Sequence, residues 1–275
     1  MYRAMTAEDY RKGLGLEPGY RVDVLIVHGC AQEYPVAMMH DALTAAGHDA
    51  ALESPVASLP TLNAAAVGPH VLWHARVYGG ALACELTHLA CVLGARCAVF
   101  IGTCGGLLES AAAGDHIVPD AVYADESSTR AYAREDGDRL HHADPAISRD
   151  LIEQLTDAGH SARRGRTVTH QAQLAESWSD ILAWQQKGWA GVEMEAASVL
   201  APAAAFSVPA AAVLVIADNL VAGQSVFHPE VRASRAQRRA ALAAAYAAAL
   251  HVILARLDAP VAPAAEPEPI PEAAQ

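Results

Sequence analysis

The chain has 275 residues, of which 53% are hydrophobic and 18% charged, and its formal net charge is −12. This length can bury a full core, and the composition is that of a globular protein rather than of a disordered chain. The acidic balance argues against a nucleic-acid-binding protein, because such proteins need a basic face to neutralise phosphates.

Two further features of composition limit the class of protein. The sequence has no uninterrupted apolar stretch of membrane-spanning length and no signal-peptide core near Met1, so we expect a cytoplasmic protein without a membrane partner. Its five cysteines are odd in number and form no CxxC pair. We therefore expect neither a disulfide framework nor a zinc site.

Apolar runs and turn residues predict strands and helices that alternate along the chain. Strands are expected over 22–27, 71–78, 98–101, 116–123, 167–170 and 211–216. Helices are expected over 35–46, 83–93, 147–158, 179–187 and 234–257. The alternation predicts a single α/β domain with a central, twisted, mixed or parallel sheet flanked by helices. We expect this domain to span residues 1–257, followed by a disordered, proline-spaced tail over 258–275.

Small and acidic residues follow several of the predicted strands. These candidate segments are His28-Gly29, Gly79-Gly80, the run 102–106, the run 193–195 and Asp218. In open α/β sheets, ligands bind beyond the carboxyl ends of the strands. The segments are therefore expected to meet in one site, with Gly29 and Gly80 among the residues that contact the ligand.

Two short motifs carry most of the chemical information. Gly102-Thr-Cys-Gly-Gly106 follows a buried apolar run, so it predicts a turn that opens its backbone amides to a ligand; the alternative is a plain tight turn. Gly191-Val-Glu-Met-Glu-Ala-Ala197 places two carboxylates before a helix-forming run. A carboxylate can accept one O–H on each oxygen, which suits the vicinal diol of a sugar. The alternative for this acidic pair is a solvated helix start, stabilised by the helix dipole.

Together these motifs resemble the nucleoside phosphorylase/nucleosidase superfamily of the purine and uridine phosphorylase type, which includes methylthioadenosine nucleosidase-like hydrolases. The resemblance implies that Glu195 accepts hydrogen bonds from the ribose hydroxyls, that Met194 packs on the sugar and that Glu193 is a structural support. It also implies that Thr103 contacts the sugar side of the ligand. The backbone of Cys104 and Gly105 would lie beside the base.

The run from Leu214 to Leu220 resembles the strand-end segment in which the family's aspartate donates a proton to the departing purine. Here Asp218 holds that position and Ala217 replaces the usual serine. General-acid help of this kind contributes roughly a hundred- to ten-thousandfold. The alternative is that Asp218 caps the following turn. By the same resemblance, Gln173 and Trp178 lie in the region that contacts the base, with an ordinary surface loop as the alternative.

The cations that hold phosphate in the family's phosphorylases are missing from the matching positions. The arginine expected after the first strand reads Glu33, and the one before the glycine motif reads Phe100. The third comes from a region where this chain has neither arginine nor lysine between Arg21 and Arg76. A carboxylate at Glu33 would repel phosphate. In the related nucleosidases a glutamate after the first strand acts as a base on water, so Glu33 is the candidate for that role.

Three functions remain open from the sequence. The first, favoured by the missing arginines, is an N-ribosyl hydrolase in which Glu33 assists the attacking water, Glu195 holds the ribose and Asp218 protonates the base. The second is a nucleoside phosphorylase, with phosphate as co-substrate. The third is a nucleoside-binding protein that does not cleave. The retained Glu195 and Asp218 favour an enzyme, because a pure binder needs no proton donor at the base.

The phosphorylase hypothesis requires an anion site built from other groups. His28, His74, Arg76 and the amides of Gly79-Gly80 are the candidates. The family resemblance also implies a homo-oligomer with a nucleoside as its small-molecule ligand. It implies no metal and no organic cofactor.

Overall fold

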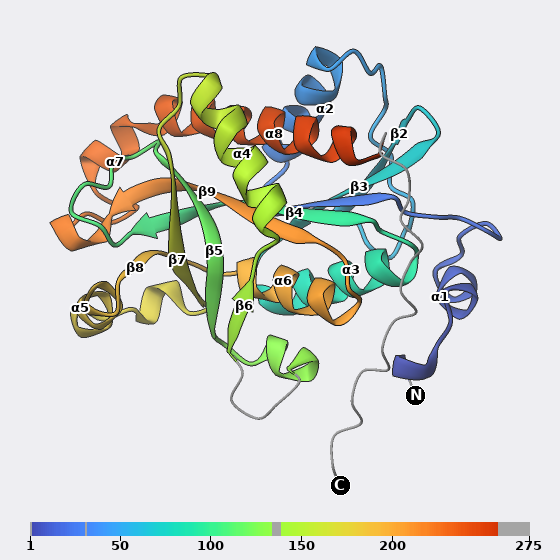
Figure 1. Cartoon of the computed structure of the whole chain (residues 1–275), viewed down its shortest axis with the longest axis horizontal. Coiled ribbons are helices and arrows are strands. Elements are labelled where there is room, and N and C mark those ends of the chain that lie inside the picture. Colours follow the sequence, from blue (N-terminus) through green and yellow to red (C-terminus); the bar gives the residue numbers. More distant parts are fainter. Residues whose placement is uncertain (1, 31, 134–138, 258–275) are drawn as a thin grey trace, which may run out of the picture.

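The computed structural model describes residues 2–30, 32–133 and 139–257. These residues form one strongly twisted sheet with helices on both faces (Figure 1). The expected tail over 258–275 lies outside the described residues.

The sheet contains nine strands. They are β1 (Val24–Gly29), β2 (Leu62–Val67), β3 (His70–Val77), β4 (Cys97–Gly106), β5 (His116–Asp125), β6 (Leu140–His142), β7 (Ala162–His170), β8 (Trp189–Glu193) and β9 (Ala210–Asn219). The α-helices are α1 (Ala7–Leu14), α2 (Tyr34–Ala45), α3 (Gly80–Val92), α4 (Pro145–Asp157), α5 (Trp178–Gln186), α6 (Ala196–Ala205), α7 (Pro229–Ala233) and α8 (Arg235–Leu257).

Strand order along the sheet is β2-β3-β1-β4-β8-β7-β5-β6, and β9 pairs with both β4 and β5. The pairs β1–β3, β1–β4, β4–β9, β5–β7 and β7–β8 are parallel. The pairs β2–β3, β4–β8, β5–β6 and β5–β9 are antiparallel. The expectation of a mixed α/β sheet in a single domain is confirmed.

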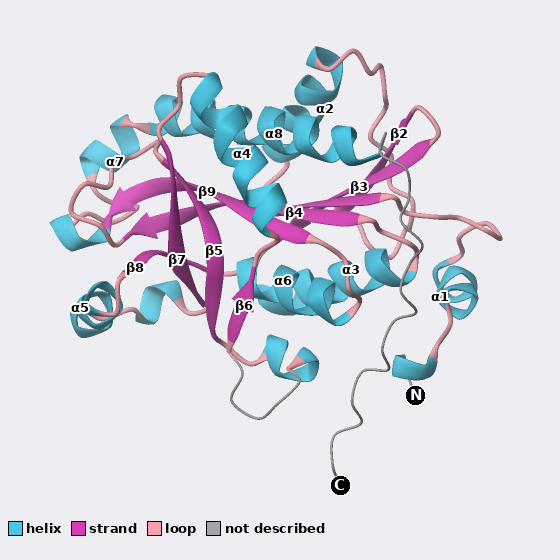
Figure 2. Cartoon of the chain, viewed as in Figure 1, coloured by secondary structure: helices cyan, strands magenta, loops and turns pink. Residues whose placement is uncertain are grey.

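Helices cover both faces of the sheet (Figure 2). The helices α2, α4 and α8 lie on one face, and α3 and α6 pack together on the other (Figure 1). The strands between them are almost fully apolar: all ten residues of β9 are buried. A strand that is buried on both faces has a continuous hydrophobic sequence rather than an alternating one. This explains why the sequence predicts β1, β4 and β9.

The glycine motif 102–106 departs from the expectation of a turn. These residues continue β4, which pairs in parallel with β9 along its whole length and meets β8 at Gly105 and Gly106. Partners on both sides satisfy the backbone of the glycine-rich end, so it stays extended. The lack of side chains serves close packing instead: a Cβ at Gly105 would lie 2.5 Å from Leu220 Cδ1.

The longest helix, α8, is long enough and apolar enough to cross a membrane, by length and composition alone. This differs from the expectation from the sequence that no such stretch is present. In this fold 56% of its most apolar window is buried. Ala245, Tyr246, Ala249 and Ile253 are fully buried within the core of the sheet and its helices. This is the arrangement of a core helix.

Candidate active site

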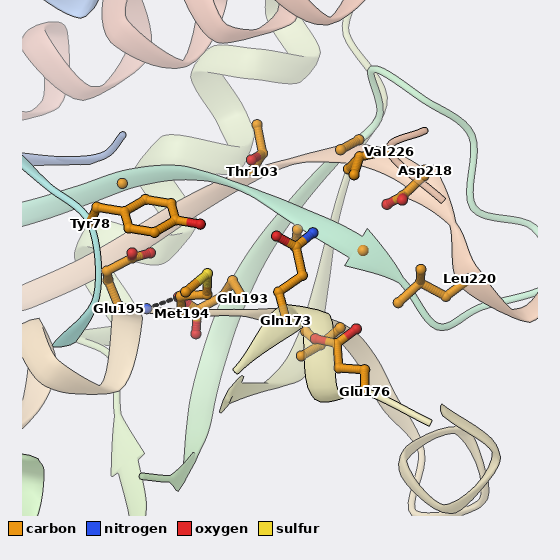
Figure 3. Close-up of a pocket in the computed structure, with 15 residues that line it drawn as sticks. Tyr78, Thr103, Gln173, Glu176, Glu193, Met194, Glu195, Asp218, Leu220 and Val226 are labelled. Carbon is orange, nitrogen blue, oxygen red and sulfur yellow. Dashed lines mark hydrogen bonds between the residues drawn. The ribbon is translucent and has the colours of Figure 1, made fainter. Parts of the chain in front are cut away.

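A pocket opens where the ends of β1, β4, β8 and β9 meet, with about 610 Å³ of empty space, open solvent at its mouth included. This size is typical of small-molecule sites. The pocket is lined by Gly29, Tyr78, Thr103, Cys104, Gly105, Gln173, Glu176, Val192, Glu193, Met194, Glu195, Ala217, Asp218, Leu220 and Val226. Figure 3 shows Tyr78 and Glu195 at one end and Asp218, Leu220 and Glu176 at the other.

The direction of β8 brings its carboxyl end into this pocket. β8 runs antiparallel to β4, with Val192 opposite Gly105 and Gly191 opposite Gly106. The chain therefore travels back along β4, toward the end of β1. This places Glu195 beside Gly29, so that a Cβ at Gly29 would lie 2.9 Å from Glu195 Oε2.

Glu195 is 5% exposed and is held by the backbone. The N–H of Gly79 donates to its Oε1 at 2.7 Å, while Oε2 faces Gly29. Burial, together with the nearby charge of Glu193, raises the pKa of Glu195 to about 8. The backbone N–H groups of Gly79 and Met194 thus position the carboxyl group, which lines the pocket where a ligand can reach it.

Both carboxyl oxygens of Glu193 accept hydrogen bonds from within the protein. Its Oε1 accepts a hydrogen bond from the Thr169 hydroxyl, and its Oε2 accepts from the N–H groups of Glu195 and Ala196 at 2.7 and 2.6 Å. Two of these donors are orphan amides at the start of α6, which helix termini leave without intrahelical partners. Glu193 therefore fixes the position of Glu195, in agreement with the structural support expected from the sequence.

Asp218 lies at the end of β9, next to an irregularity in its pairing with β4. Cys104 pairs with Ile216, but Gly105 pairs with Asp218, so Ala217 is an extra residue on the β9 side. A bulge of this kind redirects side chains, and both Ala217 and Asp218 line the pocket. The Asp218 residue is 3% exposed, and its carboxyl group makes no side-chain hydrogen bond to the described residues. Burial raises its pKa to about 6, against a lowering influence of the Arg238 guanidinium.

The remaining predicted residues of the glycine motif and of the acidic motif have distinct environments. Met194 lies between the two acidic side chains and lines the pocket, and Thr103 is exposed at its mouth. Cys104 is buried, and burial raises the pKa of its thiol well above the ordinary value, so it remains a neutral wall of the pocket. With Gly105, it forms the side of the pocket nearest to Val192 and Gly191.

Two predicted site residues do not line the pocket. Gly80 begins α3 and faces α6, where a Cβ would collide with the side chains of Ser198 and Gln171. Its lack of a side chain thus allows the two helices to approach. Glu33 is exposed at the N-cap position of α2 and makes no capping hydrogen bond. The structure does not bring Glu33 together with Glu195 and Asp218.

The structure also locates the groups proposed for an alternative anion site. Burial lowers the pKa of His28 and of His74 to about 3, so both rings are neutral at physiological pH. The ring of His28 stacks on Tyr246, and His74 Nε2 hydrogen-bonds to the Tyr246 hydroxyl at 2.8 Å. Arg76 donates to the carbonyls of Gln32 and Pro60. None of these three side chains is among the residues that line the pocket.

Phe100 occupies space beside the pocket where the family resemblance placed an arginine. Its ring is fully buried, and its Cζ lies 2.9 Å from the Cβ positions that Gly29 and Gly102 would have. An apolar ring thus fills the gap between the ends of β1 and β4. It supplies no charge for an anion.

Three polar groups of this site were not singled out as ligands from the sequence: Tyr78, Glu176 and Arg238. Tyr78 lies over the Glu195 end and is 65% exposed (Figure 3). Burial raises the pKa of Glu176 to about 7, with a further contribution from Asp218. Arg238 donates to the Val231 carbonyl at 2.8 Å and influences Asp218 through space. No local pattern marks them, because their positions depend on tertiary packing.

The described residues contain no group of three or more histidine, cysteine, aspartate or glutamate side chains that could hold a metal ion.

Comparison with known proteins assigns the chain to a family. The model of the "Phosphorylase superfamily" matches residues 79–251, which include Glu193, Glu195 and Asp218. A purine nucleoside phosphorylase of the DeoD type from Clostridium beijerinckii is 30% identical over 135 residues. This match covers 48% of the chain and 55% of that protein, so the chain spans about half the length of the relative.

Solved structures share the fold. The 5'-methylthioadenosine/S-adenosyl homocysteine nucleosidase of Campylobacter jejuni superposes with a TM-score of 0.64 at 16% identity, covering 86% of this chain and 99% of that one. The corresponding nucleosidase of Helicobacter pylori gives a TM-score of 0.61 at 14% identity, covering 85% and 99%. At these identities the similarity establishes a common fold.

Proposed function

Because the chain belongs to the phosphorylase superfamily, we propose that it cleaves the N-glycosidic bond of a purine-like nucleoside, with water as the nucleophile. One observation favours water over phosphate as the nucleophile. Among the described residues, the pocket is lined by four carboxyl groups (Glu176, Glu193, Glu195 and Asp218) and by no lysine, arginine or histidine. A phosphate dianion would find no cation in this lining to compensate its charge in a low-dielectric site, whereas water is neutral.

The ribose belongs at the Glu195 end of the pocket. The Glu195 carboxyl accepts from the sugar hydroxyls, and Met194 packs against the sugar. When the glycosidic bond stretches, the sugar becomes oxocarbenium-like and positively charged. The ionised form of Glu195 then stabilises this charge, and the low dielectric of the pocket strengthens the effect.

The base belongs at the Asp218 end. With a pKa of about 6 and no hydrogen bond within the described structure, the Asp218 carboxyl can carry a proton and donate it to the departing base. Protonation makes the base a neutral leaving group. The bulge at Ala217 serves this step, because it turns Asp218 into the pocket.

Water attacks the oxocarbenium-like carbon from the side opposite the base, its oxygen forms the new bond to that carbon, and it releases one proton to the surrounding solvent. Asp218 takes up a proton from solvent before the next turnover. This carbon is a strong electrophile, so departure of the protonated base and stabilisation by Glu195 carry most of the catalysis. The exposed position of Glu33, outside the pocket, supports a mechanism that does not depend on Glu33.

Phosphorolysis is the second candidate, and the similarity to a purine nucleoside phosphorylase over 135 residues favours it. It would require an anion site built from groups outside the pocket lining, such as Arg238. The family also favours a cytoplasmic homo-oligomer that works without a metal or organic cofactor. A nucleoside-binding protein without activity is the third candidate.

The test is base release from a panel of purine and pyrimidine nucleosides, followed by chromatography, with and without inorganic phosphate. We expect free ribose in phosphate-free buffer, and loss of the product in the Asp218→Asn variant. Formation of ribose 1-phosphate only when phosphate is present would establish phosphorolysis instead. Absence of cleavage, with a nucleoside still raising the melting temperature, would establish a binding protein.

A further inference from the structure

A second cavity, here called the apolar groove, adjoins the pocket on its Asp218 side. It holds about 670 Å³ of empty space, open solvent included. Its apolar walls are Leu174, Trp178, Ile181, Leu220, Val226 and Phe227. They come from two segments: η3 (Gln173–Ala175) with the start of α5, and the chain that follows β9.

The apolar groove gathers large hydrophobic side chains that remain open to solvent. Leu174 is 87% exposed, Phe227 64% and Trp178 54%, and Val226 is also an exposed hydrophobic residue. Scattered exposed apolar residues are ordinary, but a contiguous group beside a concave polar site marks a binding surface. The occupant of this groove must therefore present an apolar group.

The pocket and the apolar groove are continuous. Gln173, Glu176 and Asp218 line both cavities, as do Leu220 and Val226. An occupant that spans the junction thus meets two carboxyl groups at its inner end and apolar walls at its outer end. A ligand with a polar ring and an apolar extension would place the ring in the pocket and the extension in the apolar groove.

The spatial order of residues along the pocket and the apolar groove indicates which part of a nucleoside carries the apolar extension. Glu195 and Gly29 line the pocket alone, Trp178 and Phe227 line the groove alone, and Asp218 lies at the boundary. Figure 3 shows Glu195 and Asp218 at opposite ends of the pocket. The groove is thus separated from the ribose end by the base.

Both walls of the groove are anchored by hydrogen bonds. Ser177 caps α5, accepting from the N–H of Asp180 while the Asp180 carboxylate accepts from the Ser177 N–H, and this fixes Trp178 in the first turn. Asn219 Nδ2 donates to the Ala111 carbonyl at 2.9 Å, and its Oδ1 accepts from the Ala222 N–H. These contacts hold Leu220 in place, so the groove exists before a ligand binds.

We infer that the apolar groove is a subsite for an alkyl or aryl substituent on the base of the nucleoside. This inference rests on the proposed function, because the base is placed at Asp218 by the glycosidic cleavage assigned above. It narrows the substrate class to purine-like nucleosides with an apolar group on the edge of the base that points away from the ribose.

The test compares adenosine with N6-benzyladenosine as substrates for the wild-type protein and two variants on the same helix. Trp178→Ala removes a wall of the groove. Leu182→Ala is the matched control, since Leu182 is an exposed residue of α5 that does not line the groove. The readout is the ratio of kcat/KM for the two nucleosides, which cancels general damage to the enzyme.

We expect the wild-type protein to prefer N6-benzyladenosine by about tenfold or more, as burial of a phenyl ring permits. The ratio should fall to near unity in Trp178→Ala and stay unchanged in Leu182→Ala. Cleavage of adenosine with no preference, or with a preference that Trp178→Ala leaves intact, would overturn the subsite and leave the proposed function standing.

Two other outcomes would also overturn the inference. If Trp178→Ala lowers the particle mass in sedimentation without changing the ratio, a second copy of the chain covers the groove. If the wild-type protein neither cleaves nor binds adenosine or N6-benzyladenosine, by chromatography and by calorimetry, then the proposed function fails and the subsite fails with it.

Discussion

Replacing Glu195 by glutamine is expected to stabilise the protein while removing its activity. In the folded protein the pKa of this carboxyl is raised from 4.5 to about 8 by burial and by Glu193. The folded state therefore binds a proton that the unfolded state releases above pH 4.5. The stability contributed by this proton is fully present below pH 4.5 and is lost as the pH rises toward 8.

The magnitude follows from the two titrations. Each pKa unit is worth about 1.4 kcal/mol, so the ionisable carboxyl costs about 1 kcal/mol at pH 5 and about 3 kcal/mol at pH 7. Glutamine has the same shape and no charge, and its Oε1 can still accept from the Gly79 N–H. The variant should therefore melt about 6–12 °C higher than the wild-type protein at pH 7, and the difference should shrink toward pH 5.

The assay is a series of thermal melts between pH 5 and pH 8, followed by circular dichroism, on the wild-type protein and on Glu195→Gln. Glu33→Gln is the matched control, because Glu33 is exposed and should give the same melting temperature as the wild-type protein at every pH. A difference for Glu195→Gln that is independent of pH, or a variant that is less stable at pH 8 than the wild-type protein, would refute the reasoning.

Three further predictions concern activity. Asp218→Asn should lower kcat by about a hundred- to ten-thousandfold in steady-state assays, because the amide cannot donate the proton that Asp218 supplies. Glu33→Gln should cleave nucleosides at the wild-type rate, since Glu33 lies outside the pocket; a large loss would return it to the mechanism. In a pH–rate series, kcat/KM should be flat between about 6 and 8 and fall about tenfold per pH unit on either side, because the reaction requires ionised Glu195 and protonated Asp218. A profile that keeps rising above pH 8 would contradict these roles.

The sequence predicts most of the central strands but misses β8, which lies between β4 and β7, and the edge strand β2. β1 and β9 are continuous apolar runs that only a doubly covered sheet position explains. β2 was missed because Leu62–Val67 is largely alanine with one asparagine, without the β-branched residues that mark strands. α1 was missed in the polar start of the chain, although Thr6 and Asp9 form a capping box that could have indicated it.

The sequence predicts which segments reach the site but not which way each side chain faces. Glu193, Glu195 and Asp218 were found because a motif fixes their spacing. Gly80 begins a helix next to the site, yet it faces α6 rather than the pocket. Glu176 gives no local signal, because its place in the pocket results from the packing of the segment that leads into α5 against the end of β9.

The two ends of the pocket differ in what controls their charge. At the Glu195 end, Phe100 stands where the resemblance placed an arginine, and its buried ring lies next to the backbone of Gly29 and Gly102. At the other end, burial raises the pKa of Asp218 to about 6, and the Arg238 guanidinium opposes this rise. In the hydrolysis proposed above, water is a weaker nucleophile than phosphate would be, so the reaction depends more on protonation of the leaving group. The raised pKa of Asp218 therefore suits hydrolysis, independently of the residues at positions 33 and 100.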